Sequence, residues 1–114
     1  MASRASSVAS SRVGDPLADE PLVSVDFEVF GKVQGCSFTK YVRELCLKLG
    51  IVGWVKNSRN GTILGKMQGP QAVVDQMAEW LSTKGSPDSE IHHTEFRDLC
   101  CVTKRGYKGF EVRF

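Results

Sequence analysis

An alternating apolar run leads into a glycine-containing loop and then into a helical pattern, and this junction constrains the fold more than any other part of the chain. The run VSVDFEVF, residues 23–30, alternates apolar and polar positions as a half-buried strand does. The stretch that follows, FGKVQGCSFTKY, carries glycines at Gly31 and Gly35. Such strand–loop–helix junctions can direct several backbone N–H groups and a helix N-terminus to one place, which favours binding of an anion such as phosphate.

The remaining periodicities predict two helices and four further strands. Apolar residues recur at helical spacing from Phe38 to Leu49, with Ser37 placed to cap this helix and Gly50 to end it. A second helix is expected after Gly69-Pro70. Four strands are expected over residues 51–56, 62–68, 91–102 and 108–114. The resulting order, βαββαββ, predicts an α/β (α+β) two-layer sandwich in which both helices cover one face of an antiparallel sheet.

The composition indicates one modest domain preceded by a tail. The chain has 114 residues, which suffices for a single core. Residues 1–21 are rich in Ser, Ala and Asp and are predicted to be disordered, while residues 22–114 form the domain. The net charge is +2, and the tail carries −1 of it, so that the domain carries +3. This excess fits a small anionic ligand and is too weak to indicate nucleic acid.

The absence of certain sequence patterns bears on metal binding and on cellular location. The four cysteines show no C-x-x-C spacing, so no metal site is expected. We find no continuous apolar segment of the kind that would indicate a secretory signal or a membrane span. We therefore expect a cytoplasmic protein with no membrane contact. We also expect it to be a monomer. A transit peptide is the less favoured alternative, because three acids lie within residues 1–21.

The loop does not follow the common phosphate-binding motifs. Residues 31–38 match neither G-x-x-x-x-G-K-[ST] nor G-x-G-x-x-G, and Arg43 lies too far from Cys36 for a cysteine-phosphatase loop. From the residues alone, an anion-binding loop and a tight connection that merely needs two glycines are about equally well supported.

Four segments together resemble the acylphosphatase family. These are FEVFGKVQGCSFTKY, LGIVGWVKNSRNGT, MQGP and WLSTKGSP, and the similarity runs from about Val23 to Phe114. The combination of GxVQGxxF with GWVxNxxxGT is specific to this family. The resemblance implies a ferredoxin-like sandwich and a hydrolase that cleaves the carboxyl–phosphate bond of acyl phosphates without metal or organic cofactor. Its partner would be a small-molecule acyl phosphate or inorganic phosphate.

The resemblance also implies the site residues. Asn57 corresponds to the family's catalytic asparagine, which positions the attacking water, whereas Thr39 stands where the family has a catalytic arginine. Lys32 or Lys40 could replace that arginine in part, although a lysine lacks the planar guanidinium fork. The phosphate-binding loop would comprise Lys32, Val33, Gln34, Gly35, Cys36, Ser37 and Phe38.

Two hypotheses about activity follow from these matches. The retained Asn57 favours an acylphosphatase of reduced activity, and the loss of arginine at Thr39 favours a non-catalytic anion-binding or protein-interaction module. On sequence alone, an asparagine before a hairpin turn more often bonds its own backbone.

The remaining motifs have simpler readings. Trp54 and Trp80 are expected to be core aromatics. Residues 105–112, RGYKGFEV, begin like an RNA-recognition octamer but depart from it at Lys108 and Gly109. RNA binding is therefore not expected.

Overall fold

A computed structural model describes residues 21–35 and 37–114 of the chain. Residues 1–20, which hold nearly all of the predicted tail, and Cys36 of the predicted phosphate loop lie outside the described residues. The boundary predicted between tail and domain therefore stays a prediction.

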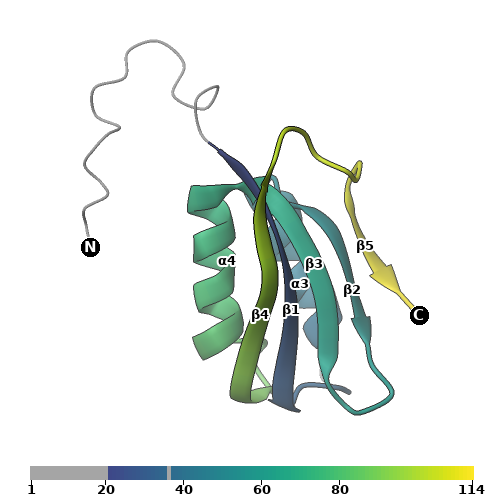
Figure 1. The fold of residues 1–114 in the computed structure, drawn as a ribbon. Helices are drawn as coiled ribbons and strands as arrows, with labels where there is room; N and C mark the ends of the chain where they lie inside the picture. Colours follow the sequence, from purple (N-terminus) through teal and green to yellow (C-terminus); the bar gives the residue numbers. More distant parts are fainter. Residues whose placement is uncertain (1–20, 36) are drawn as a thin grey trace.

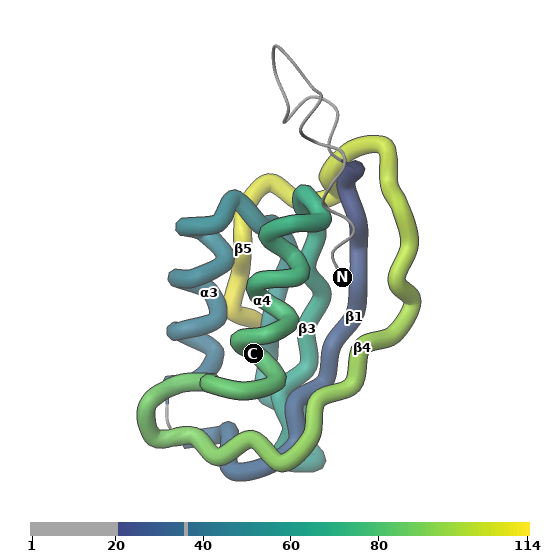
Figure 2. The backbone as a smooth tube through the Cα atoms, turned by 90° about the vertical axis from the view of Figure 1, so that its left-hand side faces the viewer, coloured from purple at the N-terminus to yellow at the C-terminus, as the bar shows by residue number. Residues whose placement is uncertain are grey.

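Within the described residues, a five-stranded sheet is covered on one face by two helices (Figure 1). The elements are β1 (Leu22–Lys32), α3 (Phe38–Leu49), β2 (Val52–Asn57), β3 (Ile63–Pro70), α4 (Gln71–Thr83), β4 (Glu90–Val102) and β5 (Phe110–Arg113). Viewed along the layers, α3 and α4 lie side by side on the same side of the strands (Figure 2). The predicted order βαββαββ and the two-layer α+β sandwich are confirmed.

The strand order in the sheet is β4-β1-β3-β2-β5. The pairs β1–β3, β1–β4 and β2–β3 are antiparallel, as expected. The fourth pair, β2–β5, is parallel, so the sheet is mixed. Residues 103–109 carry the chain from one edge strand to the other, which places β5 beside β2 with this orientation.

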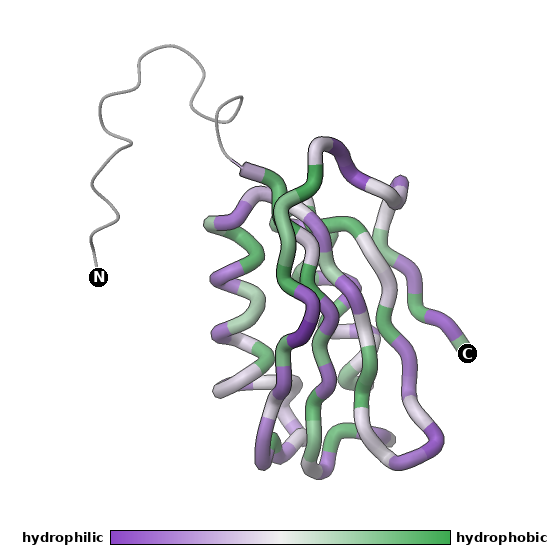
Figure 3. Tube along the Cα trace, in the orientation of Figure 1, coloured by the Kyte–Doolittle hydropathy of each residue, from purple (hydrophilic) through white to green (hydrophobic). Residues whose placement is uncertain are grey.

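The core lies between the helices and the sheet. Apolar and polar residues alternate along the strands (Figure 3), and in β1 the apolar set at 23, 25, 27 and 29 is buried. Phe38, Val42 and Cys46 face it from α3 at a spacing of one helical turn. The corresponding residues of α4 are Val74, Met77 and Leu81. Burial of these apolar side chains is the main force that holds the helices on the sheet.

The ends of α3 agree only partly with the prediction. Gly50 ends the helix in the left-handed conformation, with φ of 77°. Ser37 occupies the N-cap position, but its side chain makes no capping hydrogen bond. The reason is its backbone, which has φ of 61°, whereas a capping serine usually adopts the β region.

Strand β4 contains a β-bulge. Its register against β1 changes between Ser24↔Cys100 and Asp26↔Arg97, so that Asp98 and Leu99 together lie opposite Val25. Asp98 adopts a positive φ of 56° at this point. The bulge therefore interrupts the regular geometry of a strand that forms one edge of the sheet.

Candidate functional site

The carboxyl ends of β1 and β2 lie at the same end of the sheet. Both strands run antiparallel to β3, and Ile63 of β3 pairs with Asn57 on one side and with Val29 on the other. Asn57 and Val29 are therefore two strand spacings apart, which corresponds to a Cα–Cα distance of about 10 Å. Asn57 and the loop that follows β1 are therefore brought to one end of the molecule.

Gln34 connects this loop to the β2–β3 turn. Its side-chain nitrogen Nε2 donates hydrogen bonds to the backbone carbonyls of Ser58 and Thr62, each at 2.9 Å. Ser58 follows Asn57 directly, so one loop side chain binds both sides of the turn that begins after Asn57. The sequence placed Gln34 in the loop but did not predict this contact.

The two loop glycines have conformations that other residues rarely adopt. Gly31 has φ of 137°, and a Cβ there would collide with the carbonyl oxygen of Glu90 in β4. Gly35 has φ of 79°, and a Cβ there would meet no atom within 4 Å. Gly31 is thus required by close packing, whereas the backbone at Gly35 adjoins open space.

The N-terminus of α3 supplies the electrostatics expected at an anion site. The amide of Tyr41 donates to the carbonyl of Ser37, whereas the amides at the start of an α-helix have no acceptor within it. The first turn of α3 contains no acidic residue. No carboxylate of that turn therefore competes with an anion for its N–H groups or for the positive end of the helix dipole.

The predicted loop residues divide into buried and exposed positions. Val33 and Phe38 are buried in the core and anchor the two ends of the loop. Lys32, Gly35 and Ser37 are exposed. The buried side chains support the loop, and only the exposed residues and the backbone are accessible to a ligand.

The predicted catalytic residues lie near this loop. Asn57 is exposed and, by alternation along β2, lies on the same face as the buried Val55, which is the face that the helices cover. Thr39 is half-buried in the first turn of α3, and Lys40 beside it is exposed. The roles assigned to these residues stay predictions.

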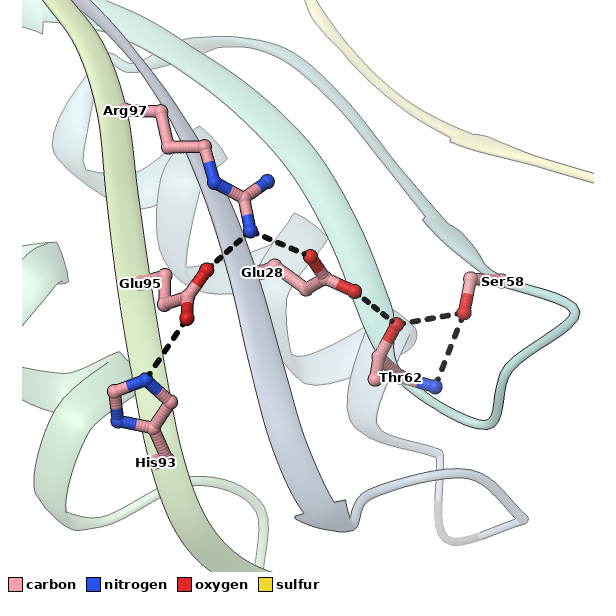
Figure 4. Close-up of polar contacts among 6 residues, drawn as sticks. All are labelled: Glu28, Ser58, Thr62, His93, Glu95 and Arg97. Atoms are coloured by element: carbon pink, nitrogen blue, oxygen red, sulfur yellow. Dashed lines mark hydrogen bonds and ion pairs between the residues drawn. The ribbon is translucent and has the colours of Figure 1, made fainter.

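Sequence reasoning missed a set of polar side chains beside the turn. Thr62 donates from its hydroxyl to Glu28 Oε2 at 2.8 Å, and its Oγ1 lies 2.6 Å from Ser58 Oγ (Figure 4). Arg97 of β4 contacts the other oxygen of Glu28. Ser58 and Thr62 lie within the GWVxNxxxGT segment, but Glu28 and Arg97 lie outside both family motifs, and the strand register brings them to the turn.

Two further properties concern the described residues only. No group of three or more His, Cys, Asp or Glu side chains there could hold a metal ion. Neither described helix is long and apolar enough to span a membrane.

Comparison with known proteins decides the family. The family model for acylphosphatase matches residues 25–112. The chain belongs to the acylphosphatase family. The chain is 50% identical over 93 residues to acylphosphatase-2 of Xenopus tropicalis, and the alignment covers 82% of the chain and 90% of the relative. It is 47% identical over 94 residues to acylphosphatase-2 of Bos taurus, with 82% and 95% covered.

The fold of the solved acylphosphatases is the same. The structure of an acylphosphatase from Coxiella burnetii aligns with a TM-score of 0.73 and 28% identity, covering 82% of this chain and 94% of that one. The family resemblance and the ferredoxin-like sandwich predicted from the sequence are confirmed. The protein is accordingly an acylphosphatase-like hydrolase.

Proposed function

We propose that the protein hydrolyses the carboxyl–phosphate bond of small acyl phosphates, at a rate reduced by the presence of Thr39 in place of arginine. The observation that carries the proposal is the pair of hydrogen bonds by which Gln34 binds the turn after Asn57. These bonds support a candidate anion-binding loop and a candidate water-binding side chain at the end of the sheet where β1 and β2 finish.

The loop and the first turn of α3 would bind the phosphoryl group. Backbone N–H groups from the exposed stretch around Gly35 and from the helix N-terminus would donate to its oxygens. Such donors stabilise the charge that builds on those oxygens as the reaction proceeds. Binding in this mode requires no metal ion.

Asn57 would hold the attacking water through its side-chain amide. The water oxygen attacks phosphorus while the bond between phosphorus and the acyl oxygen breaks, and the electron pair of that bond leaves on the carboxylate. The proton of the water passes to a phosphate oxygen, because neither an asparagine amide nor a threonine hydroxyl can act as a general base near neutral pH. The products are a carboxylate and inorganic phosphate.

Thr39 limits this reaction. A guanidinium at this position could bind two phosphoryl oxygens and would stay charged throughout. A threonine hydroxyl offers one neutral donor. By analogy with other phosphoryl-transfer sites, this difference corresponds to a factor of ~10²–10⁵ in rate.

The experiment compares hydrolysis of benzoyl phosphate by the wild-type protein and by Thr39→Arg, Asn57→Ala and Thr103→Arg. Thr103 is exposed and lies in the β4–β5 connection, so its variant adds the same charge away from the site. We expect Thr39→Arg to raise kcat/KM by ~10²-fold or more, Asn57→Ala to lower it by ~10²-fold, and Thr103→Arg to leave it unchanged. An Asn57→Ala variant as active as wild type would overturn the mechanism.

A second candidate is a non-catalytic phosphate-binding or protein-interaction module, which Thr39 favours. Calorimetric titration with inorganic phosphate separates the two. Binding of phosphate without hydrolysis by the wild-type protein, and without gain of activity in Thr39→Arg, would support the module.

We also propose that the protein is a cytoplasmic monomer that acts independently of membranes and nucleic acid. The mild charge of the domain and the sequence patterns support this proposal. Size-exclusion chromatography with light scattering tests the monomer directly.

A further inference from the structure

The polar side chains next to the β2–β3 turn continue across the sheet to its far edge. Figure 4 shows Ser58 and Thr62 at the turn, Glu28 on β1, and Arg97, Glu95 and His93 on β4. We call these six residues the cross-sheet chain. Arg97 Nη2 donates to Glu28 Oε1 at 2.8 Å, while the other carboxylate oxygen accepts from Thr62.

Glu28 fixes the direction of the hydrogen bonds at the turn. An ionised carboxylate only accepts, so the single hydroxyl hydrogen of Thr62 is committed to Glu28. Thr62 Oγ1 must then accept from the hydroxyl of Ser58. Ser58 Oγ in turn accepts from the backbone N–H groups of Asn60 and Thr62, at 3.2 and 3.1 Å. One charged group thereby orders the amides of Asn60 and Thr62 in the turn.

The contacts of Glu28 are better shielded than those of an ordinary surface ion pair. Its side chain is 14% exposed, and Thr62 is 6% exposed. Charge-assisted hydrogen bonds are stronger where water is partly excluded. Arg97 is 48% exposed and is itself held by an ion pair with Glu95, whose other oxygen lies 3.1 Å from His93 Nε2. Arg97 is thus restrained on the outer side and bound to Glu28 on the inner side.

We propose that Arg97 is a positioning residue for the acylphosphatase reaction, acting through Glu28 to hold the turn that follows Asn57. This inference rests on the proposed function of Asn57. Arg97 touches no reacting atom; it keeps the Glu28 carboxylate oriented toward Thr62, and the ordered turn holds Asn57 where the water must bind. Small displacements of a water-positioning group slow the chemical step more than they weaken substrate binding.

The test compares Arg97→Met, Arg97→Lys and the control Arg113→Met. Arg113 serves as the control because it is 46% exposed and is also paired with an acid two residues earlier, Glu111, although its guanidinium also lies 4.9 Å from the ring centroid of Trp54. We expect Arg97→Met to lower kcat for benzoyl phosphate about three- to tenfold with little change in KM, Arg97→Lys to recover part of this loss, and Arg113→Met to change neither constant. An equal loss of kcat in Arg97→Met and Arg113→Met would overturn the proposal.

A second measurement does not depend on activity. Arg97→Met should speed solvent exchange of the Asn60 and Thr62 amides, measured by NMR, while exchange in the core strands stays as in the wild type. In a Glu28→Gln background, Arg97→Met should have no additional effect on these amides, because its influence passes through the carboxylate. Unchanged exchange of both amides in Arg97→Met would also overturn the proposal.

The hydrolysis and amide-exchange measurements distinguish failure of the proposed function from failure of the positioning role. If neither the wild type nor Thr39→Arg hydrolyses benzoyl phosphate, the proposed function fails, and amide exchange still decides whether Arg97 orders the turn. If the wild type hydrolyses benzoyl phosphate but neither kcat nor amide exchange changes in Arg97→Met, only the positioning role fails.

Discussion

The side-chain nitrogen of Gln34 lies 2.9 Å from the carbonyl oxygen of Thr62, although 28 positions separate the two residues. The same nitrogen donates to the carbonyl of Ser58. A side-chain amide offers two N–H groups, and here both bind the backbone of one turn. The loop after β1 and the turn after β2 therefore behave as one structural unit.

The first prediction concerns Gln34→Glu. The substitution keeps the size of the side chain but replaces two donors by a carboxylate that faces two carbonyl oxygens. We expect a loss of about 0.5–1.5 kcal/mol in the free energy of unfolding and weaker binding of inorganic phosphate, measured by urea unfolding and calorimetry. Gln76→Glu, on the exposed face of α4, introduces the same charge and should have neither effect. Similar results for both variants would mean that charge alone, not the contact, is responsible.

The second prediction compares Gly31→Ala with Gly35→Ala. Both positions have positive φ, but only a Cβ at Gly31 would meet backbone atoms, those of Glu90 and His92 in β4. We expect Gly35→Ala to cost about 1 kcal/mol of unfolding free energy and Gly31→Ala clearly more, because backbone atoms cannot move aside as a flexible side chain does. Urea unfolding of the two variants provides the measurement. Equal losses would contradict the close packing of β1 and β4 at this point.

The elements that repeat locally could be predicted from the sequence. The alternation over residues 23–30 and the helical spacing from Phe38 to Leu49 correspond directly to β1 and α3, because each depends on one buried face. The parallel pairing of β5 with β2 could not be predicted in this way. It depends on the path of residues 103–109, which no periodicity specifies.

Contacts between residues far apart in the sequence could not be predicted, for the same reason. Gln34 was assigned to the loop from a motif, but its two acceptors lie on another hairpin. Glu28 and Arg97 belong to no motif and meet only because β1 and β4 are adjacent. Trp54 was expected in the core, but it lies on the face of β2 opposite the buried Val55, with the guanidinium of Arg113 4.9 Å from its ring centroid. Alternation along β2 could have indicated this placement.

The third prediction concerns acid stability. Hydrogen bonds with Arg97 and, to a lesser extent, His93 hold the pKa of Glu95 below its ordinary value of 4.5. A carboxylate with a lowered pKa in the folded state stabilises the protein above its unfolded pKa, and this contribution is lost as the pH falls through the folded pKa. We therefore expect the wild type to lose more unfolding free energy than Glu95→Gln between about pH 5.5 and about pH 3.

Urea unfolding at the two pH values measures this difference. Glu111→Gln serves as a control, because it removes an exposed acid that is likewise paired with an arginine two residues away. A Glu95→Gln variant with the full acid sensitivity of the wild type would show that Arg97 and Glu95 do not stabilise each other in solution.

The fourth prediction concerns the described cysteines. Burial raises the pKa of the Cys46 thiol to about 12, whereas Cys100 and Cys101 are exposed on β4. Because the thiolate is the reactive form, iodoacetamide at about pH 8 should modify Cys100 and Cys101 and leave Cys46 unmodified in the folded protein. Peptide mass mapping with and without urea measures the labelling. Rapid labelling of Cys46 without urea would mean that α3 opens readily.

The bulge at Asp98 and Leu99 has a consequence for the behaviour of the protein at high concentration. A long straight edge strand offers a row of unpaired backbone groups onto which a second molecule can add its own strand. In β4 this row is interrupted at Asp98 and Leu99, and the register against β1 shifts again at His92, so the strand presents no long regular template for intermolecular pairing. We therefore expect the irregular backbone at Asp98 to disfavour self-assembly through the exposed edge strand β4.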